Sequence, residues 1–185
     1  QDNHLRTHTT MACWGQAEPL HNEFIAHLHG YGWRLERNKF DYDLAKAAKE
    51  KGAQLLLNCT YTRHEKIDNH WNVFCKTQQA DHETEIQIHA KYIIDASGRK
   101  GVFAKKEGAK KQIFDRLLGI YAWYHPQDGQ DNNAVPLVEA QENGWWYSAI
   151  LPDQRWITAW MTDSDLSKDT NWTDAKTYVN HLAKA

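Results

Sequence analysis

The sequence predicts an α+β chain, with a helix-bearing region in its first part and an antiparallel sheet in its second. Two observations lead to this fold class: one segment has the apolar spacing of a helix, and several runs of β-forming residues follow it. The chain has 185 residues, of which 41% are apolar and 25% charged, so it can form a globular fold with a core.

The first regular element is a helix over residues 40–51. Phe40, Leu44 and Ala47 fall at helical spacing, and Gly52 follows as a C-cap. Aspartates in the first turn and lysines in the last turn suit the helix dipole.

Residues 53–62 predict a strand after this helix, as in the second half of a βαβ unit. We therefore expect part of a mostly parallel, Rossmann-like sheet here. Residues 70–78 and 84–97 predict two further strands that form an antiparallel excursion, with turns at 68–69 and 78–83. Residues 92–94 are continuously apolar, which is typical of a strand buried on both faces.

The second region contains three strong strand patterns, over residues 117–125, 144–152 and 155–163. Residues 134–140 form a weaker pattern that contains Pro136, so we expect an edge strand there. From Asn171 onward the sequence allows a helix with Thr173 as N-cap and Asp174 in the first turn. The predicted regions are residues 1–112 and residues 113–185.

Composition excludes several classes of function. The formal charge is −2, from 22 basic and 24 acidic residues mixed along the chain, so we expect no nucleic-acid partner and no anionic membrane surface. No apolar run reaches the length of a membrane span. Three cysteines fit neither a disulfide framework nor a zinc site, which favours a cytoplasmic protein. His27 and His29 lack a third convincing ligand, so no metal is expected.

The stretch Asp-Ala-Ser-Gly-Arg, residues 95–99, follows the predicted buried strand and precedes a short basic helix. At such a strand end Asp95 can accept hydrogen bonds from a ligand hydroxyl, and Gly98 lets the backbone approach closely. The N–H groups of the next helix and the Arg99 guanidinium suit a phosphate. The alternative is an ordinary strand-to-helix turn capped by Asp or Ser, and the motif alone leaves both interpretations open.

The order of three segments, residues 32–56, 92–104 and 144–163, resembles the middle of a FAD-dependent monooxygenase of the p-hydroxybenzoate hydroxylase superfamily. Within it, the chain is most similar to the flavin-dependent halogenase-like branch. About 150 residues are covered, and Tyr147 and Leu151 depart from the halogenase pattern, so the resemblance there does not extend to halogenation itself.

The resemblance implies a fold, a cofactor and a set of site residues. FAD contacts would come from the helix beside the cofactor and from the strand-end motif, namely Arg37, Asp95, Ser97, Gly98 and Arg99. Trp145, Trp146 and Tyr147 would lie on a substrate-domain strand, within an aromatic wall that also includes Trp156 and Trp160. Strand alternation places Trp145 and Tyr147 on one face and Trp146 on the other. The sequence singles out no catalytic acid or base.

Two motifs of the family have no counterpart here: the Gly-x-Gly-x-x-Gly of the ADP site and the later Gly-Asp. The sequence is therefore either a fragment of a longer flavoprotein or a stand-alone descendant, and we expect FAD binding by these residues alone to be weak or absent.

The predicted function is part of a FAD-dependent oxidoreductase or monooxygenase acting on a small aromatic or apolar organic molecule. The alternative is a non-enzymatic derivative that binds a small ligand or oligomerises, for example as a homodimer.

Overall fold

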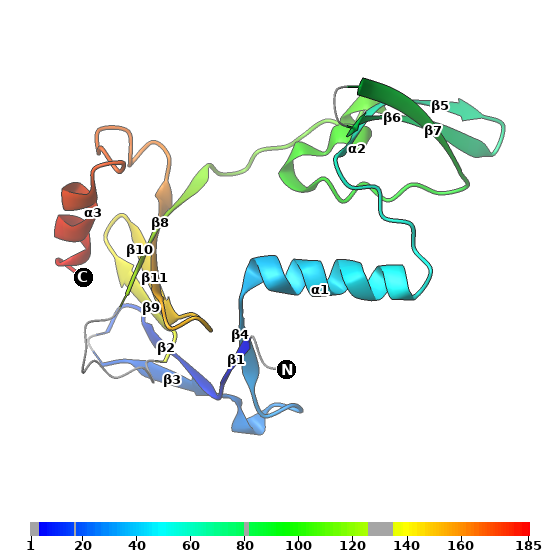
Figure 1. Cartoon of the computed structure of the whole chain (residues 1–185). Helices are drawn as coiled ribbons and strands as arrows, with labels where there is room; N and C mark the ends of the chain where they lie inside the picture. The colour runs from blue at the N-terminus through cyan, green and yellow to red at the C-terminus, as the bar shows by residue number, and fades with distance from the viewer. Residues whose placement is uncertain (1–3, 17, 80–81, 126–134) are drawn as a thin grey trace. The chain divides into compact units, whose positions relative to one another are not determined.

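The computed structural model describes residues 4–16, 18–79, 82–125 and 135–185. Helices and strands are mixed, which confirms the α+β class (Figure 1). The chain divides into a larger unit, residues 1–44 with 113–185, and a smaller unit, residues 45–112. Residues 1–44 are thus grouped with the second predicted region. The FAD-binding-like and substrate-like roles of residues 1–112 and 113–185 remain predictions.

The larger unit is built on a six-stranded sheet with the order β3-β2-β9-β10-β11-β8. Its strands, in this order, are Leu20–Glu23, Thr9–Cys13, Leu137–Gln141, Gly144–Ile150, Trp156–Asp163 and Leu117–Tyr124. The β2–β9 pair is parallel, and the other neighbours are antiparallel. The strands of the predicted second region, β8 to β11, pair antiparallel as expected, but the sheet also includes β2 and β3 from the first region.

Strand β9 corrects the prediction for residues 134–140. We expected an edge strand because of its proline, but β9 lies between β2 and β10. Pro136 stands just before the strand, and its carbonyl accepts a hydrogen bond from the Met11 amide at 2.8 Å. The missing N–H of proline therefore falls outside the paired residues, which is why the strand can occupy an interior position.

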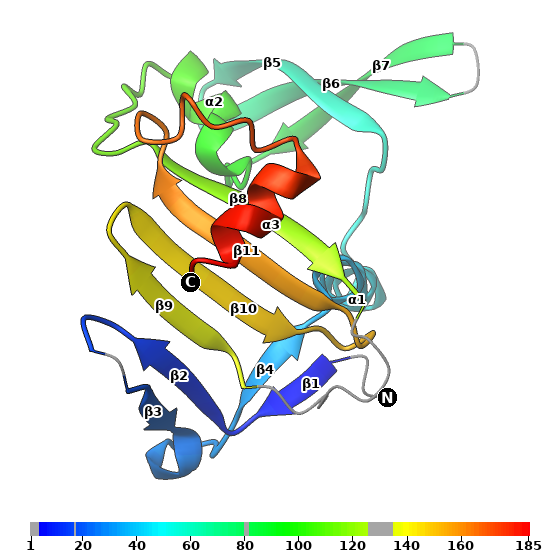
Figure 2. The ribbon, with the colours of Figure 1, turned by 90° about the vertical axis from the view of Figure 1, so that its left-hand side faces the viewer.

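Helix α3, Ala175–Leu182, lies across one face of this sheet (Figure 2). Tyr178 of this helix forms a buried cluster with Trp146 and Trp160 of the sheet. The helix begins one residue later than predicted. Asp174 is the N-cap, because its side chain accepts a hydrogen bond from the Thr177 amide at 2.9 Å.

A two-stranded ribbon, β1 (His4–Thr7) and β4 (Gly32–Leu35), precedes α1, Arg37–Glu50. The predicted helix is confirmed, although it starts at Arg37 instead of Phe40. Ion pairs four residues apart, such as Arg37 with Asp41, extend its first turn. The division between the two units falls within α1.

The smaller unit contains a three-stranded antiparallel sheet of β5 (Cys59–Ile67), β6 (His70–Gln79) and β7 (His82–Ala90), which confirms the antiparallel excursion. Two 3-10 turns, Phe24–Ala26 in the larger unit and Gly98–Lys100 here, and the short helix α2, Val102–Lys106, complete the elements.

Two strand predictions in the smaller unit are wrong. Residues 53–58 are irregular, and the strand begins only at Cys59. Residues 92–97 are also irregular, and Tyr92 and Ile94 are 88% and 90% exposed instead of buried. Both segments have strand-forming sequences but pair with no strand in the described residues, where β2–β9 is the single parallel pair. Residues 4–16, 18–79, 82–125 and 135–185 therefore do not form the expected mostly parallel sheet.

Of the helices that the structure describes, none combines the length and the apolar character required for a membrane span.

Candidate functional site

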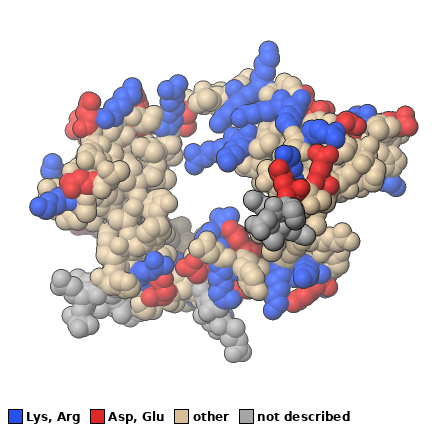
Figure 3. Space-filling view, turned by 45° about the horizontal axis from the view of Figure 1, so that its top comes forward, with Lys and Arg blue, Asp and Glu red and all other residues tan. Residues whose placement is uncertain are grey.

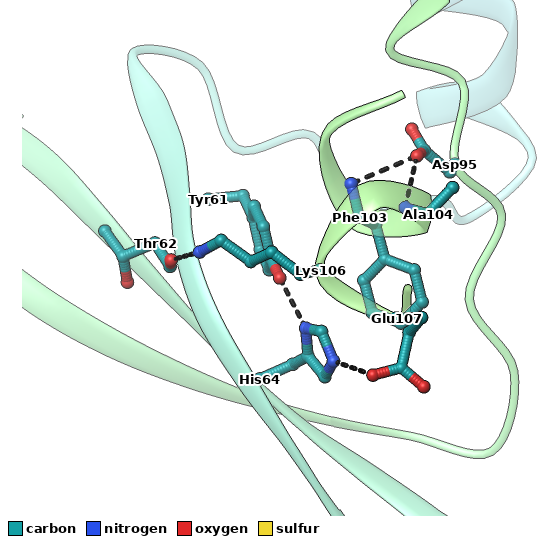
Figure 4. A network of polar contacts seen from close by, with 8 residues as sticks. All are labelled: Tyr61, Thr62, His64, Asp95, Phe103, Ala104, Lys106 and Glu107. Carbon is teal, nitrogen blue, oxygen red and sulfur yellow. Dashed lines mark hydrogen bonds and ion pairs between the residues drawn. The ribbon is translucent and has the colours of Figure 1, made fainter. Parts of the chain in front are cut away.

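The motif at residues 95–99 forms the turn that leads into α2, and Asp95 is its centre (Figure 4). One carboxylate oxygen accepts hydrogen bonds from the amide and the hydroxyl of Ser97. The other accepts the amides of Phe103 at 3.1 Å and Ala104 at 3.0 Å. The Ser97 hydroxyl in turn accepts the Val102 amide at 2.8 Å. The alternative of a turn capped by Asp and Ser before a helix is therefore present, although the segment before it is irregular instead of a strand.

These hydrogen bonds determine the charge state of Asp95. The Ser97 hydroxyl, followed by the backbone amides of Ala104, Ser97 and Phe103, lowers the pKa of Asp95 to about 2. An ionised carboxylate has roughly four acceptor positions, and the four donors occupy them. Asp95 therefore has no acceptor position left for a ligand hydroxyl in this conformation, and the first amides of α2 are already bonded.

The other predicted cofactor residues, Gly98, Arg99 and Arg37, are exposed. Gly98 has a φ of 63° and open space around it, as the turn requires, and Arg99 is exposed beside it. Arg37 lies in the larger unit, where its guanidinium binds both carboxylate oxygens of Asp41 at 2.8–2.9 Å. The structure thus brings Asp95, Ser97, Gly98 and Arg99 together in one turn, whereas Arg37 belongs to the other unit. A role of these residues in FAD binding stays a prediction.

The other end of α2 is fixed by contacts that the sequence did not predict (Figure 4). The Lys106 ammonium donates to the Thr62 carbonyl. His64 contacts the Tyr61 hydroxyl through Nδ1 and the Glu107 carboxylate, at 2.6 Å, through Nε2. No sequence pattern marks this network, because its members are brought together only by the packing of α2 on the sheet.

The six-stranded sheet of the larger unit has one face covered by α3 and a second face that is partly exposed, which we call the open face; Ala149 on that second face is only 1% exposed. Trp146 and Trp160 are 3% and 2% exposed on the covered face, beneath α3. Trp145 and Tyr147 lie on the other face and are half-buried. The division that alternation predicted for these strand residues is confirmed. Trp156, like Trp160, falls on the covered face by the register of β11, so the expected aromatic wall is split between the two faces.

The open face carries aromatic side chains that the sequence analysis missed. Tyr121 and Trp123 on β8 are 57% and 49% exposed, and their ring centroids are 4.8 Å apart. The ring centroids of Trp14 and Trp145 are 6.1 Å apart. The sequence pattern could have indicated these residues, because side chains alternate between the two faces of a strand and Tyr121 and Trp123 are two residues apart in residues 117–124.

Two polar groups are close to this face. The Arg34 guanidinium donates to the Ile150 carbonyl at 3.2 Å, and burial lowers the pKa of Arg34. Burial raises the pKa of Tyr147, while the nearby Arg34 charge opposes that shift. Tyr147 is therefore an uncharged phenol at neutral pH.

Charged side chains gather elsewhere. The lysine-rich stretch 105–111 is exposed, and in Figure 3 Lys and Arg side chains gather near the top of the view.

A cavity of about 370 Å³ in the larger unit is lined by Phe114, Asp115, Arg116, Asp163, Ser164, Asp165 and Lys168. Within the described ranges, His, Cys, Asp and Glu side chains form no group of three that could hold a metal.

The chain has sequence relatives among known proteins. No family model matches the chain. The chain is 27% identical over 172 residues to the FAD-dependent oxidoreductase LodB of Marinomonas mediterranea, covering 92% of this chain and 45% of that protein. It is 26% identical over 142 residues to the 1H-pyrrole-2-carbonyl-[peptidyl-carrier protein] brominase of Pseudoalteromonas luteoviolacea, covering 71% of this chain and 33% of that protein.

Solved structures show the same fold. The flavin-dependent halogenase CmlS matches 99% of this chain with a TM-score of 0.80 and 19% identity, and the chain covers 34% of it. The myxobacterial halogenase CndH matches 98% with a TM-score of 0.77 and 17% identity, and the chain covers 42% of it. The chain thus spans less than half the length of these relatives. It is homologous to FAD-dependent oxidoreductases and flavin-dependent halogenases, as the resemblance in its sequence indicated.

Proposed function

We propose that the chain is part of a FAD-dependent oxidoreductase of the monooxygenase type, which acts on a small aromatic or apolar organic molecule. One observation carries this proposal: the six-stranded sheet leaves one face open, and that face is lined by Trp145, Tyr147, Tyr121 and Trp123. An apolar wall of this kind binds a planar substrate and excludes water from it.

The residues of the open face would bind and orient the substrate, and FAD, when bound, would supply the redox chemistry. We propose a cytoplasmic location, since Cys13, Cys59 and Cys75 are free thiols.

The second candidate function is a non-enzymatic module that binds a small ligand or forms a homodimer. Its support is the turn at residues 95–99, where the Asp95 acceptors and the first amides of α2 are already bonded to one another. The exposed apolar side chains of Tyr92 and Ile94 in the same unit add surface that association would bury.

A titration with FAD tests the flavoenzyme proposal. The 185-residue chain is titrated while flavin fluorescence is followed, together with the variants Arg99→Ala and, as a matched exposed neighbour, Lys100→Ala. Saturable binding that Arg99→Ala weakens and Lys100→Ala leaves unchanged would support the proposal. A folded chain without saturable binding would mean that flavin binding requires residues of a longer protein, and it would favour the module for this chain alone. Sedimentation velocity would then detect a homodimer.

A further inference from the structure

One row of residues crosses the open face and leaves a gap between two tyrosines. Tyr147 on β10 pairs with Ala159 on β11, and Ala159 pairs with Tyr121 on β8. Neighbouring strands are about 4.8 Å apart, so the backbones of the two tyrosines are separated by about 9.6 Å, with a single methyl group between them. We call Tyr147, Ala159 and Tyr121 the ring slot.

The neighbouring rows form the two ends of the ring slot. On one side Met161 pairs with Gly119, and its Sδ lies 3.0 Å from the position that a Cβ on Gly119 would take, so the Met161 side chain forms this end. On the other side Ile157 pairs with Trp123, whose indole contacts Tyr121 and forms an end wall. Since Ala159 is only half-buried and Tyr121 is exposed, solvent reaches the floor and one wall of the slot.

The width of the ring slot fits one aromatic ring. Side chains on a strand stand roughly perpendicular to the sheet, so the two phenol rings rise on either side of Ala159. Aromatic rings in contact have centroids about 4.5–7 Å apart, and a ring placed midway between walls about 9.6 Å apart is about 4.8 Å from each. A saturated ring, with hydrogens above and below its mean plane, is thicker and fits less well.

The surroundings favour an uncharged ring. The slot and the rows on both sides contain no Asp, Glu, Lys or Arg side chain. The Arg34 guanidinium interacts electrostatically with Tyr147, and it donates a hydrogen bond to the Ile150 carbonyl. At the end wall the Arg155 guanidinium lies 5.9 Å from the Trp123 ring centroid and is ion-paired with Asp153. A charged ligand would therefore lose its hydration here without gaining an unpaired opposite charge.

We propose that the ring slot binds a flat, uncharged aromatic ring edge-on, with its faces against Tyr147 and Tyr121 and its edge on Ala159. The identification of this ring as a substrate rests on the proposed function. The same chemistry is offered by the ring system of a flavin, and the experiment separates the two sources.

The test uses the full chain and ligand-observed NMR, which detects weak binding. The probes are 2-naphthol, its saturated counterpart decahydro-2-naphthol, and riboflavin, which carries the flavin ring without phosphate. Ala159→Leu fills the slot. Ala140→Leu is the matched control, because Ala140 pairs with Trp145 on the same face but outside the slot. Tyr121→Ala removes one exposed wall.

We expect 2-naphthol or riboflavin to bind and decahydro-2-naphthol to bind more weakly. Ala159→Leu should abolish ring binding, and Tyr121→Ala should weaken it about two- to tenfold, the range for losing one aromatic contact. Ala140→Leu should leave it unchanged. Binding of 2-naphthol alone indicates a substrate-type ring, and binding of riboflavin alone indicates the flavin ring.

Absence of binding by both flat probes, or equal binding by the wild type and a folded Ala159→Leu variant, would overturn the ring slot. Failure of the proposed function has a different signature. The FAD titration depends on Arg99, which lies in the smaller unit, so the chain can lack FAD affinity and still bind 2-naphthol in the slot.

Discussion

The docking of α3 on the sheet gives a direct prediction about stability, and Tyr178 is the residue to change. Its side chain is 5% exposed, its hydroxyl donates to the Thr158 carbonyl at 2.9 Å, and it lies 2.9 Å from the Thr158 hydroxyl. Its ring contacts Trp146 edge-on, with centroids 5.4 Å apart. The variant Tyr178→Phe removes only the hydroxyl, whereas Tyr178→Ala also removes the ring.

Phenylalanine removes the hydrogen bond to the Thr158 carbonyl, whereas the Thr158 hydroxyl keeps its contact with the Tyr124 hydroxyl. The cost in the free energy of unfolding is therefore about 0.5–1.5 kcal/mol, the net value of one hydrogen bond. Alanine adds a cavity, so its cost is about 3–5 kcal/mol, as for other large aromatic truncations. Val179→Ala is the matched control, because Val179 is the next residue of the same helix and is exposed. Its cost should stay below about 1 kcal/mol.

Urea unfolding followed by tryptophan fluorescence measures these differences. Of the nine tryptophans, only Trp71 lies in the smaller unit, so the signal reports on the larger unit that contains α3. The shift of the midpoint at an unchanged slope gives the change in free energy. If Tyr178→Ala costs no more than Val179→Ala, then α3 does not hold the covered face and the reasoning about two unlike faces fails.

Three further predictions concern individual positions. Gly144→Ala should lower the free energy of unfolding by about 1–3 kcal/mol, because an added Cβ would lie 2.1 Å from the Met161 carbonyl oxygen. Gly119→Ala is the control, because a Cβ there would meet only the flexible Met161 side chain. Its cost in the same urea titration should be smaller. Ile150→Ala should cost about 2–5 kcal/mol by the same measurement, since Ile150 is fully buried. Asp95→Asn should lower the melting temperature of the smaller unit, measured by circular dichroism. The pKa of Asp95 is lowered to about 2 in the fold, below its usual value of about 3.9, so the advantage of the wild type should be constant above about pH 5 and decrease between about pH 4 and pH 2. A pH-independent difference would contradict the capping role.

The elements predicted correctly are those whose signals are local. Residues 40–51 combine helical spacing, charges suited to the helix dipole and a C-terminal Gly52 with a φ of 96°. Strands β9, β10 and β11 pair in sequence across short loops, whereas β8 pairs with the more distant β11. Local propensity and tertiary packing agree in these segments, and such agreement makes an element predictable from sequence.

The errors fall where the outcome depends on distant partners. The apolar character of Tyr92 and Ile94 predicts a buried strand correctly only if another strand pairs with them, and none of the described strands does so. Likewise, Pro136 predicts an edge only if it occupies a paired position, and it falls just before β9. Propensity describes what a segment can form, whereas pairing decides what it forms.

The same distinction explains the candidate site. From the sequence, the open face was predictable in part, because alternation separates Trp145 and Tyr147 from Trp146 whatever their neighbours are. Tyr121 on β8 lies across Ala159 from Tyr147, and this proximity follows from the strand order, which the sequence did not reveal. The ring slot is therefore a product of topology.

The turn at residues 95–99 shows why a short motif can have two functions. A carboxylate at a strand end can accept from a ligand hydroxyl or from the first amides of the following helix, and its few acceptor positions cannot fully satisfy both. In this fold the Ser97 hydroxyl and the Phe103 and Ala104 amides occupy those positions. A ligand that used Asp95 would have to displace at least one of these donors and loosen the start of α2. Lys106 and Glu107 hold the other end of α2 against the sheet, which makes that displacement more costly. Arg99, whose guanidinium lies outside this network, is therefore the residue of the motif best placed to contact an anion without disturbing the fold.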